Sequence, residues 1–162
     1  MLRIDKSIYD TNLAICENIS YFKKIDRGLL SQNILGYLRN FIEYIVIKEF
    51  SQGDDVNPND YDFRVAALKY IKSRGNLRFL YKFHDLLQKS VSHYTVDGDG
   101  SERLMLKYYE YLLKVKKFLK EKYNMNVLEN INEFPLNIDT ELNEYYSKIA
   151  KKSISLARVV DE

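Results

Sequence analysis

The segment from Arg27 to Phe50, RGLLSQNILGYLRNFIEYIVIKEF, carries the longest unbroken helical pattern of apolar residues in the sequence. Its apolar side chains recur every three or four positions, which places them on one face of a helix, and further apolar residues widen that face. A helix this apolar requires neighbours on more than one side. The segment therefore predicts a buried central helix of an all-α fold. The inward residues are Leu30, Ile34, Leu35, Leu38, Phe41, Ile42, Ile45 and Val46.

Capping and turn residues divide the rest of the chain into further helices around the central one. Only two prolines and six glycines interrupt the 162 residues, so long helices are favoured. The expected architecture is an all-α, up-and-down bundle of five to six helices. Besides the central helix, we expect helices over residues 7–24, 61–74, 77–91 and 102–123, a short helical turn at 127–131, and a last helix from 139 or 140.

Two polar loops, at residues 51–60 and 92–101, connect these helices. The first loop does not divide the chain into domains, because both of its flanks carry one-sided apolar stripes that need each other for burial. We therefore expect a single helical domain over residues 1–162. No stop signal ends the last helix, which leads us to expect the N-terminal domain of a longer protein, with the other domains of that protein as partners.

The second loop, SHYTVDGDGS, collects His93, Tyr94 and two aspartates in a stretch that contains glycine, and binding residues are often on such loops. The DGDG run at 97–100 lacks the ligand spacing of a calcium loop and the Glu that closes one. A capping turn is the favoured interpretation, with Asp99 or Ser101 at the start of the next helix.

The composition narrows the classes of function. A net charge of +2 gives no overall attraction to nucleic acid, so such a contact requires a local patch. Cys16, the single cysteine, rules out an internal disulfide and a zinc site with several thiolates, and we expect it in the core. With two histidines, no phosphate-binding glycine loop and no nucleophile elbow, we expect no cofactor or metal. The sequence shows no signal peptide or membrane span, so we expect a cytoplasmic protein that does not bind membranes.

The helix expected at 102–123 carries basic residues with tyrosines between them, a combination suited to binding a phosphate backbone and stacking a base. RNA or DNA is therefore a candidate partner. Glu110 and Glu121 interrupt the positive run, so a solvated helix surface is the alternative interpretation. The candidate nucleic-acid-binding residues are Arg103, Lys107, Lys114 and Lys117.

The dipeptide Arg39-Asn40 lies inside the apolar central helix, where a guanidinium and an amide are costly to bury without partners. We therefore expect Arg39 to lie in a shared polar pocket. His93 or Tyr94 of the second loop is the expected source of a partner. The alternative is a pair with Glu43, one helical turn away.

Two stretches place an Arg a few residues before a His or a residue in its place: RFLYKFH runs from Arg78 to His84, and RNFIEY runs from Arg39 and Asn40 to Tyr44. An all-α bundle of this size with such spacing resembles the HEPN superfamily, whose active members are metal-independent ribonucleases. The resemblance implies that Arg and His converge across a homodimer. There His acts on the 2′-hydroxyl or the leaving group, and Arg stabilises the phosphorane.

The resemblance leads us to expect a HEPN-like recognition or assembly domain of a larger bacterial nucleic-acid-processing or defence protein, attached to an ATP-dependent helicase or other motor. One alternative is an active ribonuclease that uses Arg78 and His84, or Arg39 with His93. A protein-binding bundle with no nucleic-acid partner is the second alternative. If no catalysis occurs, His84 is expected to be a histidine on the helix surface.

Overall fold

The computed structural model describes residues 1–22, 32–92, 98–133, 147 and 150–151. These residues form helices and contain no strand, so the expected all-α bundle is confirmed. No helix in the described ranges is long and apolar enough to cross a membrane. The α-helices are α1 (Arg3–Phe22), α2 (Gln32–Ser51), α3 (Tyr61–Lys72), α4 (Arg78–Ser92) and α5 (Gly98–Tyr123), and there are 3-10 turns at Gly75–Leu77 and Ile131–Glu133.

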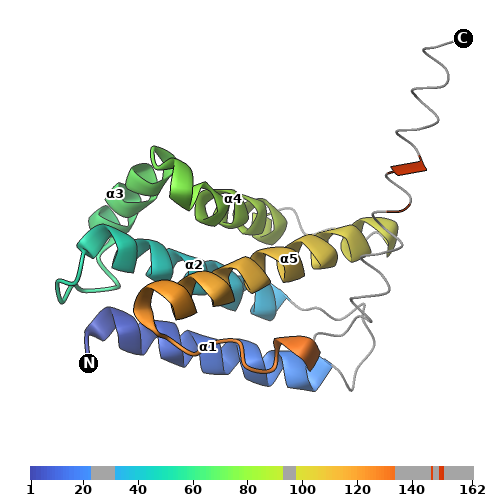
Figure 1. Ribbon diagram of the computed structural model, residues 1–162, viewed down its shortest axis with the longest axis horizontal. Helices are drawn as coiled ribbons and strands as arrows, with labels where there is room; N and C mark the ends of the chain where they lie inside the picture. Colours follow the sequence, from blue (N-terminus) through green and yellow to red (C-terminus); the bar gives the residue numbers. More distant parts are fainter. Residues whose placement is uncertain (23–31, 93–97, 134–146, 148–149, 152–162) are drawn as a thin grey trace, which may run out of the picture.

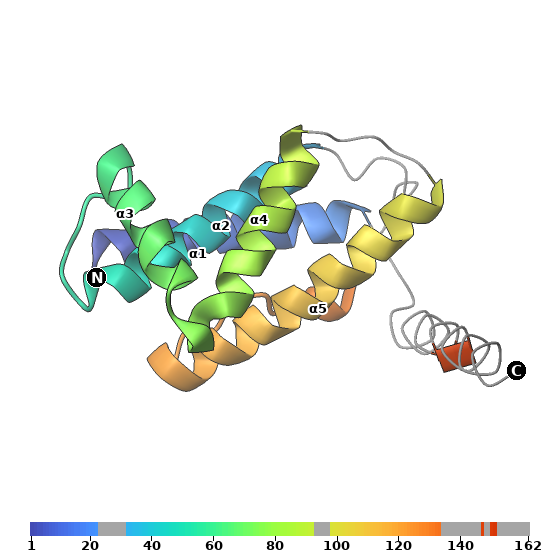
Figure 2. The ribbon, with the colours of Figure 1, turned by 90° about the horizontal axis from the view of Figure 1, so that it is seen from above.

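Helix α2 lies at the centre of the bundle and packs against α1, α3 and α4 (Figure 1). It runs antiparallel to α1, while α3 and α4 form a corner on the opposite side of α2 from α1 (Figures 1 and 2). Ile34, Leu38, Phe41 and Ile45 are at most 1% exposed, as their spacing predicted. Burial of each such side chain contributes roughly 1.5–3 kcal/mol, so this helix organises the core.

The chain reverses direction where turn residues were expected. After α2, Gln52 and Gly53 adopt positive φ values of 50° and 93°, a conformation that ends a helix and that glycine adopts without steric cost. The side chain of Asp60 accepts a hydrogen bond from the Phe63 backbone N–H at 3.2 Å and so caps the start of α3. The 51–60 loop therefore forms as the sequence predicts.

A segment after α5, residues 124–131, returns along α1, and we call it the strap. Asn124 ends α5 with a φ of 54°, and the Leu128 N–H donates to Asn12 Oδ1 on α1 at 2.7 Å. Cys16, expected in the core, is half-buried, and burial raises the pKa of its thiol. Met125, Val127, Leu128 and Ile131 of the strap are at most 5% exposed, so the strap completes the core over α1.

Three expected boundaries are wrong. Helix α1 begins at Arg3 rather than at residue 7. Helix α5 begins at Gly98 rather than at 102, so Asp99 and Ser101 lie inside the helix and do not cap it. The short turn expected at 127–131 forms later, at Ile131–Glu133, because residues 124–128 have no regular secondary structure and the Leu128 N–H bonds Asn12 on α1. Residues 27–31 of the expected central helix lie outside the described residues. So does the last expected helix, apart from the helical residues 147, 150 and 151.

Candidate functional site

A polar cluster centred on Glu43 joins three helices. Glu43 lies in the middle of α2, and its carboxylate Oε1 is 2.9 Å from Nε2 of His84 on α4. The other carboxylate oxygen pairs with the guanidinium of Arg64 on α3. The side chains of Glu43 and His84 are only 12% and 11% exposed, so the contact is largely shielded from water. A single carboxylate therefore connects α2 to both helices of the α3–α4 corner.

Arg39, one turn before Glu43, joins the same cluster from the rim. Its Nη1 donates to Gln88 Oε1 on α4 at 3.5 Å. Its Nε is buried and has no hydrogen-bond partner among the described residues. Arg39 and Asn40 are half-buried, and the hydrogen-bond partner of Arg39 comes from α4. The partners expected from the loop, His93 and Tyr94, lie outside the described residues.

The electrostatics of the cluster keep His84 neutral. Burial and the nearby Arg39 lower its pKa to about 4, Arg64 adds to this effect, and Asp85 opposes it. The guanidiniums of Arg39 and Arg64 both lie near the ring, so a proton on the imidazole would add positive charge next to two cations. A neutral His84 with its proton on Nε2 donates that proton to the carboxylate of Glu43.

Only one of the two residues Arg78 and His84 belongs to the cluster. Arg78 is exposed at the start of α4, whereas His84 is 8% exposed and faces α2. The expectation of a surface histidine is therefore wrong, because Glu43 holds the ring inside the bundle. Within one chain the structure brings His84 together with Arg39 rather than with Arg78. A ring that is buried, neutral and bonded to Glu43 is suited to positioning helices.

A second buried ionic cluster lies at the end of α2, and the sequence reasoning missed it. Lys48 Nζ is 2.6 Å from Asp5 Oδ1 on α1 and lies 4.4 Å from the ring centre of Tyr123. Glu49 binds Lys122 Nζ at 2.6 Å and accepts a hydrogen bond from the Tyr123 hydroxyl. Burial and the Glu49 carboxylate raise the pKa of Tyr123 strongly. The adjacent charges Lys48-Glu49, inside an apolar helix, could have predicted this cluster.

The residues expected to bind nucleic acid lie on α5 among acidic neighbours. Lys107, Lys114 and Lys117 are exposed, and Arg103 lies on the same helix. Helical spacing places Glu110 and Glu121 on the same face, and Lys117 Nζ is 3.9 Å from Glu121 Oε1. This face therefore has mixed charge.

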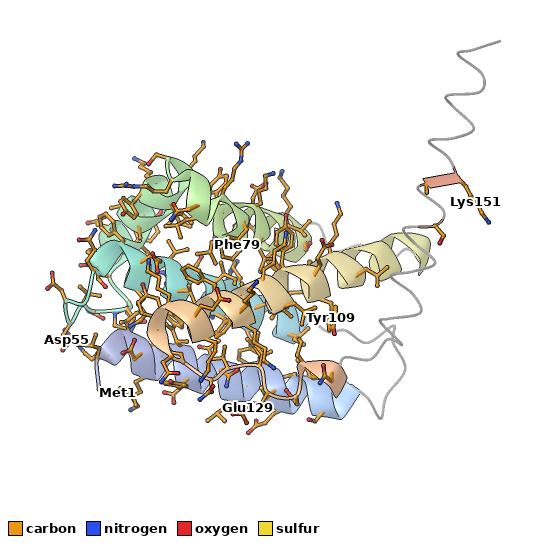
Figure 3. All side chains as sticks on the ribbon, viewed as in Figure 1. Met1, Asp55, Phe79, Tyr109, Glu129 and Lys151 are labelled. Atoms are coloured by element: carbon orange, nitrogen blue, oxygen red, sulfur yellow. The ribbon has the colours of Figure 1, made fainter. Side chains whose placement is uncertain are left out.

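A stronger concentration of positive charge lies on α3 and α4. Residues 64–92 contain seven Lys or Arg and one acidic residue, Asp85. The chain has 25 basic and 23 acidic residues, so the remainder carries a net charge of −4. Side chains with nitrogen at their tips project outward from these two helices (Figure 3). We call the exposed basic residues of this stretch the outer basic surface: Lys69, Lys72, Arg74, Arg78, Lys82 and Lys89.

Comparison with family models finds no family that matches this chain, and neither the curated proteins nor the solved structures contain a match. Within the ranges that the structure describes, no three His, Cys, Asp or Glu side chains are grouped so as to hold a metal ion. The two buried clusters and the outer basic surface are therefore the features that point to a function.

Proposed function

We propose that this chain is a HEPN-like helical recognition domain that binds nucleic acid through its outer basic surface, within a larger bacterial nucleic-acid-processing or defence protein. The observation that carries the binding proposal is the separation of charge: seven basic residues against one acidic residue in residues 64–92 of an otherwise acidic chain. Lys and Arg side chains bind nucleic acid mainly by displacing counterions from its phosphates.

Repulsion among the like charges of the outer basic surface reduces the stability of the fold. Arg78 and Lys82 lie four residues apart on α4, and like charges at this spacing on a helix destabilise it by about 0.2–0.5 kcal/mol per pair. A polyanion relieves this repulsion when it binds. In contrast, Asp5 and Glu43 already neutralise Lys48 and Arg64, the less exposed cations between the helices.

Recognition is preferred to catalysis because of the state of His84. Glu43 engages its Nε2, and its low pKa makes it a weak base near neutral pH. Cleavage of RNA is the second candidate function, and the proximity of Arg39 to His84 in one cluster favours it. A ribonuclease assay with His84→Gln decides this point: cleavage by the parent that the substitution abolishes supports catalysis, and cleavage by neither protein supports recognition.

Two matched triple variants test the binding proposal. One replaces Lys69, Arg78 and Lys82 by Gln on the outer basic surface, and the other replaces Lys107, Lys114 and Lys117 on α5. Each removes three exposed positive charges, and the readout is the anisotropy of labelled RNA and DNA at two salt concentrations. We expect the first variant to bind at least tenfold more weakly and to lower the salt slope by about 2 for a single strand, and the second to change affinity less than threefold.

The opposite ranking of the two variants would assign binding to α5. Failure of the parent protein to bind any RNA or DNA at low salt overturns the proposal, and leaves a bundle that binds other proteins as the remaining function.

A further inference from the structure

Two tyrosines at the α3–α4 corner lie directly under basic side chains of the outer basic surface. The Nζ of Lys72 lies 5.6 Å from the ring centre of Tyr81, and Cζ of Arg74 lies 4.7 Å from the ring centre of Tyr70. Both rings are half-buried. Each ring therefore packs against the bundle, and a basic side chain covers it.

Tyr81 has the better position to meet a ligand. It follows Arg78 by three residues and precedes Lys82, so Arg78 and Tyr81 are neighbours on the surface of α4. Tyr70 instead packs against the ring of Phe50, with ring centres 5.3 Å apart. An aromatic ring with Lys72 over its face and Arg78 one helical turn away is the arrangement that holds a base and its adjoining phosphates.

We infer that the α3–α4 corner binds single-stranded nucleic acid, with a base stacked on Tyr81 and the flanking phosphates held by the outer basic surface. This inference rests on the function proposed above and names its substrate class. A duplex keeps its bases stacked inside and presents phosphates alone, so it can use the lysines and arginines but not the ring. A single strand uses both, with the base displacing Lys72 from the ring.

The test compares single and double strands on the full chain. The probes are labelled RNA and DNA strands of about twelve nucleotides, a length in the range of single-strand sites, and the matching duplexes. Tyr81→Leu removes the ring and keeps much of its apolar bulk, while Tyr81→Phe keeps the ring. Tyr61→Leu is the matched control, because Tyr61 is a 75% exposed tyrosine at the other end of α3.

We expect Tyr81→Leu to weaken single-strand binding by about five- to a hundredfold and duplex binding less than twofold. Tyr81→Phe and Tyr61→Leu should bind as the parent does. RNA and DNA strands should respond alike, since every base has a face that can stack. Equal binding of single strands and duplexes, with no loss in Tyr81→Leu, overturns this inference and leaves the proposed function standing. Absence of binding to any probe overturns both.

A second measurement avoids any substitution. Photo-crosslinking of the parent protein to a single strand that contains 5-bromouracil should attach the strand to the peptide that carries Tyr81. Attachment confined to α5 or to the strap contradicts the inference, whether or not Tyr81→Leu folds.

Discussion

Glu43 Oε1 and His84 Nε2 lie 2.9 Å apart, and this contact joins the central helix to α4 inside the bundle. The carboxylate of Glu43 also pairs with Arg64 from α3, so one acidic residue contacts both helices that carry the outer basic surface. The buried cluster therefore determines how the proposed binding surface is presented. Substitutions in the cluster and on the surface should have different effects, the first on stability and the second on binding.

Replacement of Glu43 should destabilise the fold. Glu43→Leu leaves the partly buried guanidinium of Arg64 without its anion, and we expect a loss of about 2–3 kcal/mol in the free energy of unfolding. Urea denaturation followed by circular dichroism measures it. Glu121→Leu is the matched control, because Glu121 forms an exposed pair with Lys117, and such pairs contribute about 0–1 kcal/mol. Equal losses in the two variants would contradict a central position for Glu43.

His84 should make stability depend on pH in a defined window. Its pKa falls from 6.5 to about 4 on folding, so between these values the unfolded chain binds more protons than the folded chain. The contribution is complete above pH 6.5 and is lost as pH falls toward 4, by an amount on the order of 2–3 kcal/mol.

The variant that checks this prediction is His84→Gln, which keeps a donor for Glu43 and has no titratable ring. Unfolding free energies measured from pH 7 to pH 4 should fall less steeply in His84→Gln than in the parent. Identical slopes would mean that another group dominates the acid sensitivity. The direct measurement is the titration of the His84 ring protons by NMR, which should show no protonation near pH 6.

The second ionic cluster should respond to loss of one hydroxyl. Tyr123→Phe removes the hydrogen bond to Glu49, whose side chain is only 4% exposed, and should cost about 1–2 kcal/mol. Tyr61→Phe makes the same chemical change at a 75% exposed position and should cost almost nothing. Thermal unfolding of the two variants supplies the comparison, and a cost for Tyr61→Phe as large as that for Tyr123→Phe would contradict the cluster.

Much of the fold could be predicted from local patterns. The apolar spacing of α2 and the polar residues of the 51–60 loop depend on short-range rules, and the structure follows both. The start of α5 was misplaced because Gly98 and Gly100, which usually disfavour helix, are helical there. Local sequence patterns could not predict that the strap packs on α1, because that contact joins residues more than a hundred positions apart.

The candidate site was predictable only in part. A guanidinium in an apolar helix led us to expect polar neighbours for Arg39, and its Nη1 does bond Gln88 on α4. Its neighbours Gln88 and Arg64 could not be named, since they depend on how α3 and α4 cross α2. The outer basic surface was visible in the sequence as an excess of charge in residues 64–92, but the near-zero total concealed it. The net charge of a segment therefore indicates a binding surface better than the net charge of the whole chain does.

The last prediction concerns the strap and its contact with α1. Asn12 is 8% exposed, and its Oδ1 accepts the Leu128 N–H at 2.7 Å, at a residue whose φ of 53° is unfavourable for leucine. Asn12→Ala leaves this buried N–H without its acceptor, which should cost about 1–3 kcal/mol. Hydrogen exchange at Leu128 should accelerate at least tenfold, while exchange in α2 follows global stability alone.

Asn18→Ala is the control, because the Asn18 amide donates to Ala14 O within α1 and should not affect the strap. Unchanged exchange at Leu128 in Asn12→Ala would show that the apolar residues of the strap hold it without this hydrogen bond.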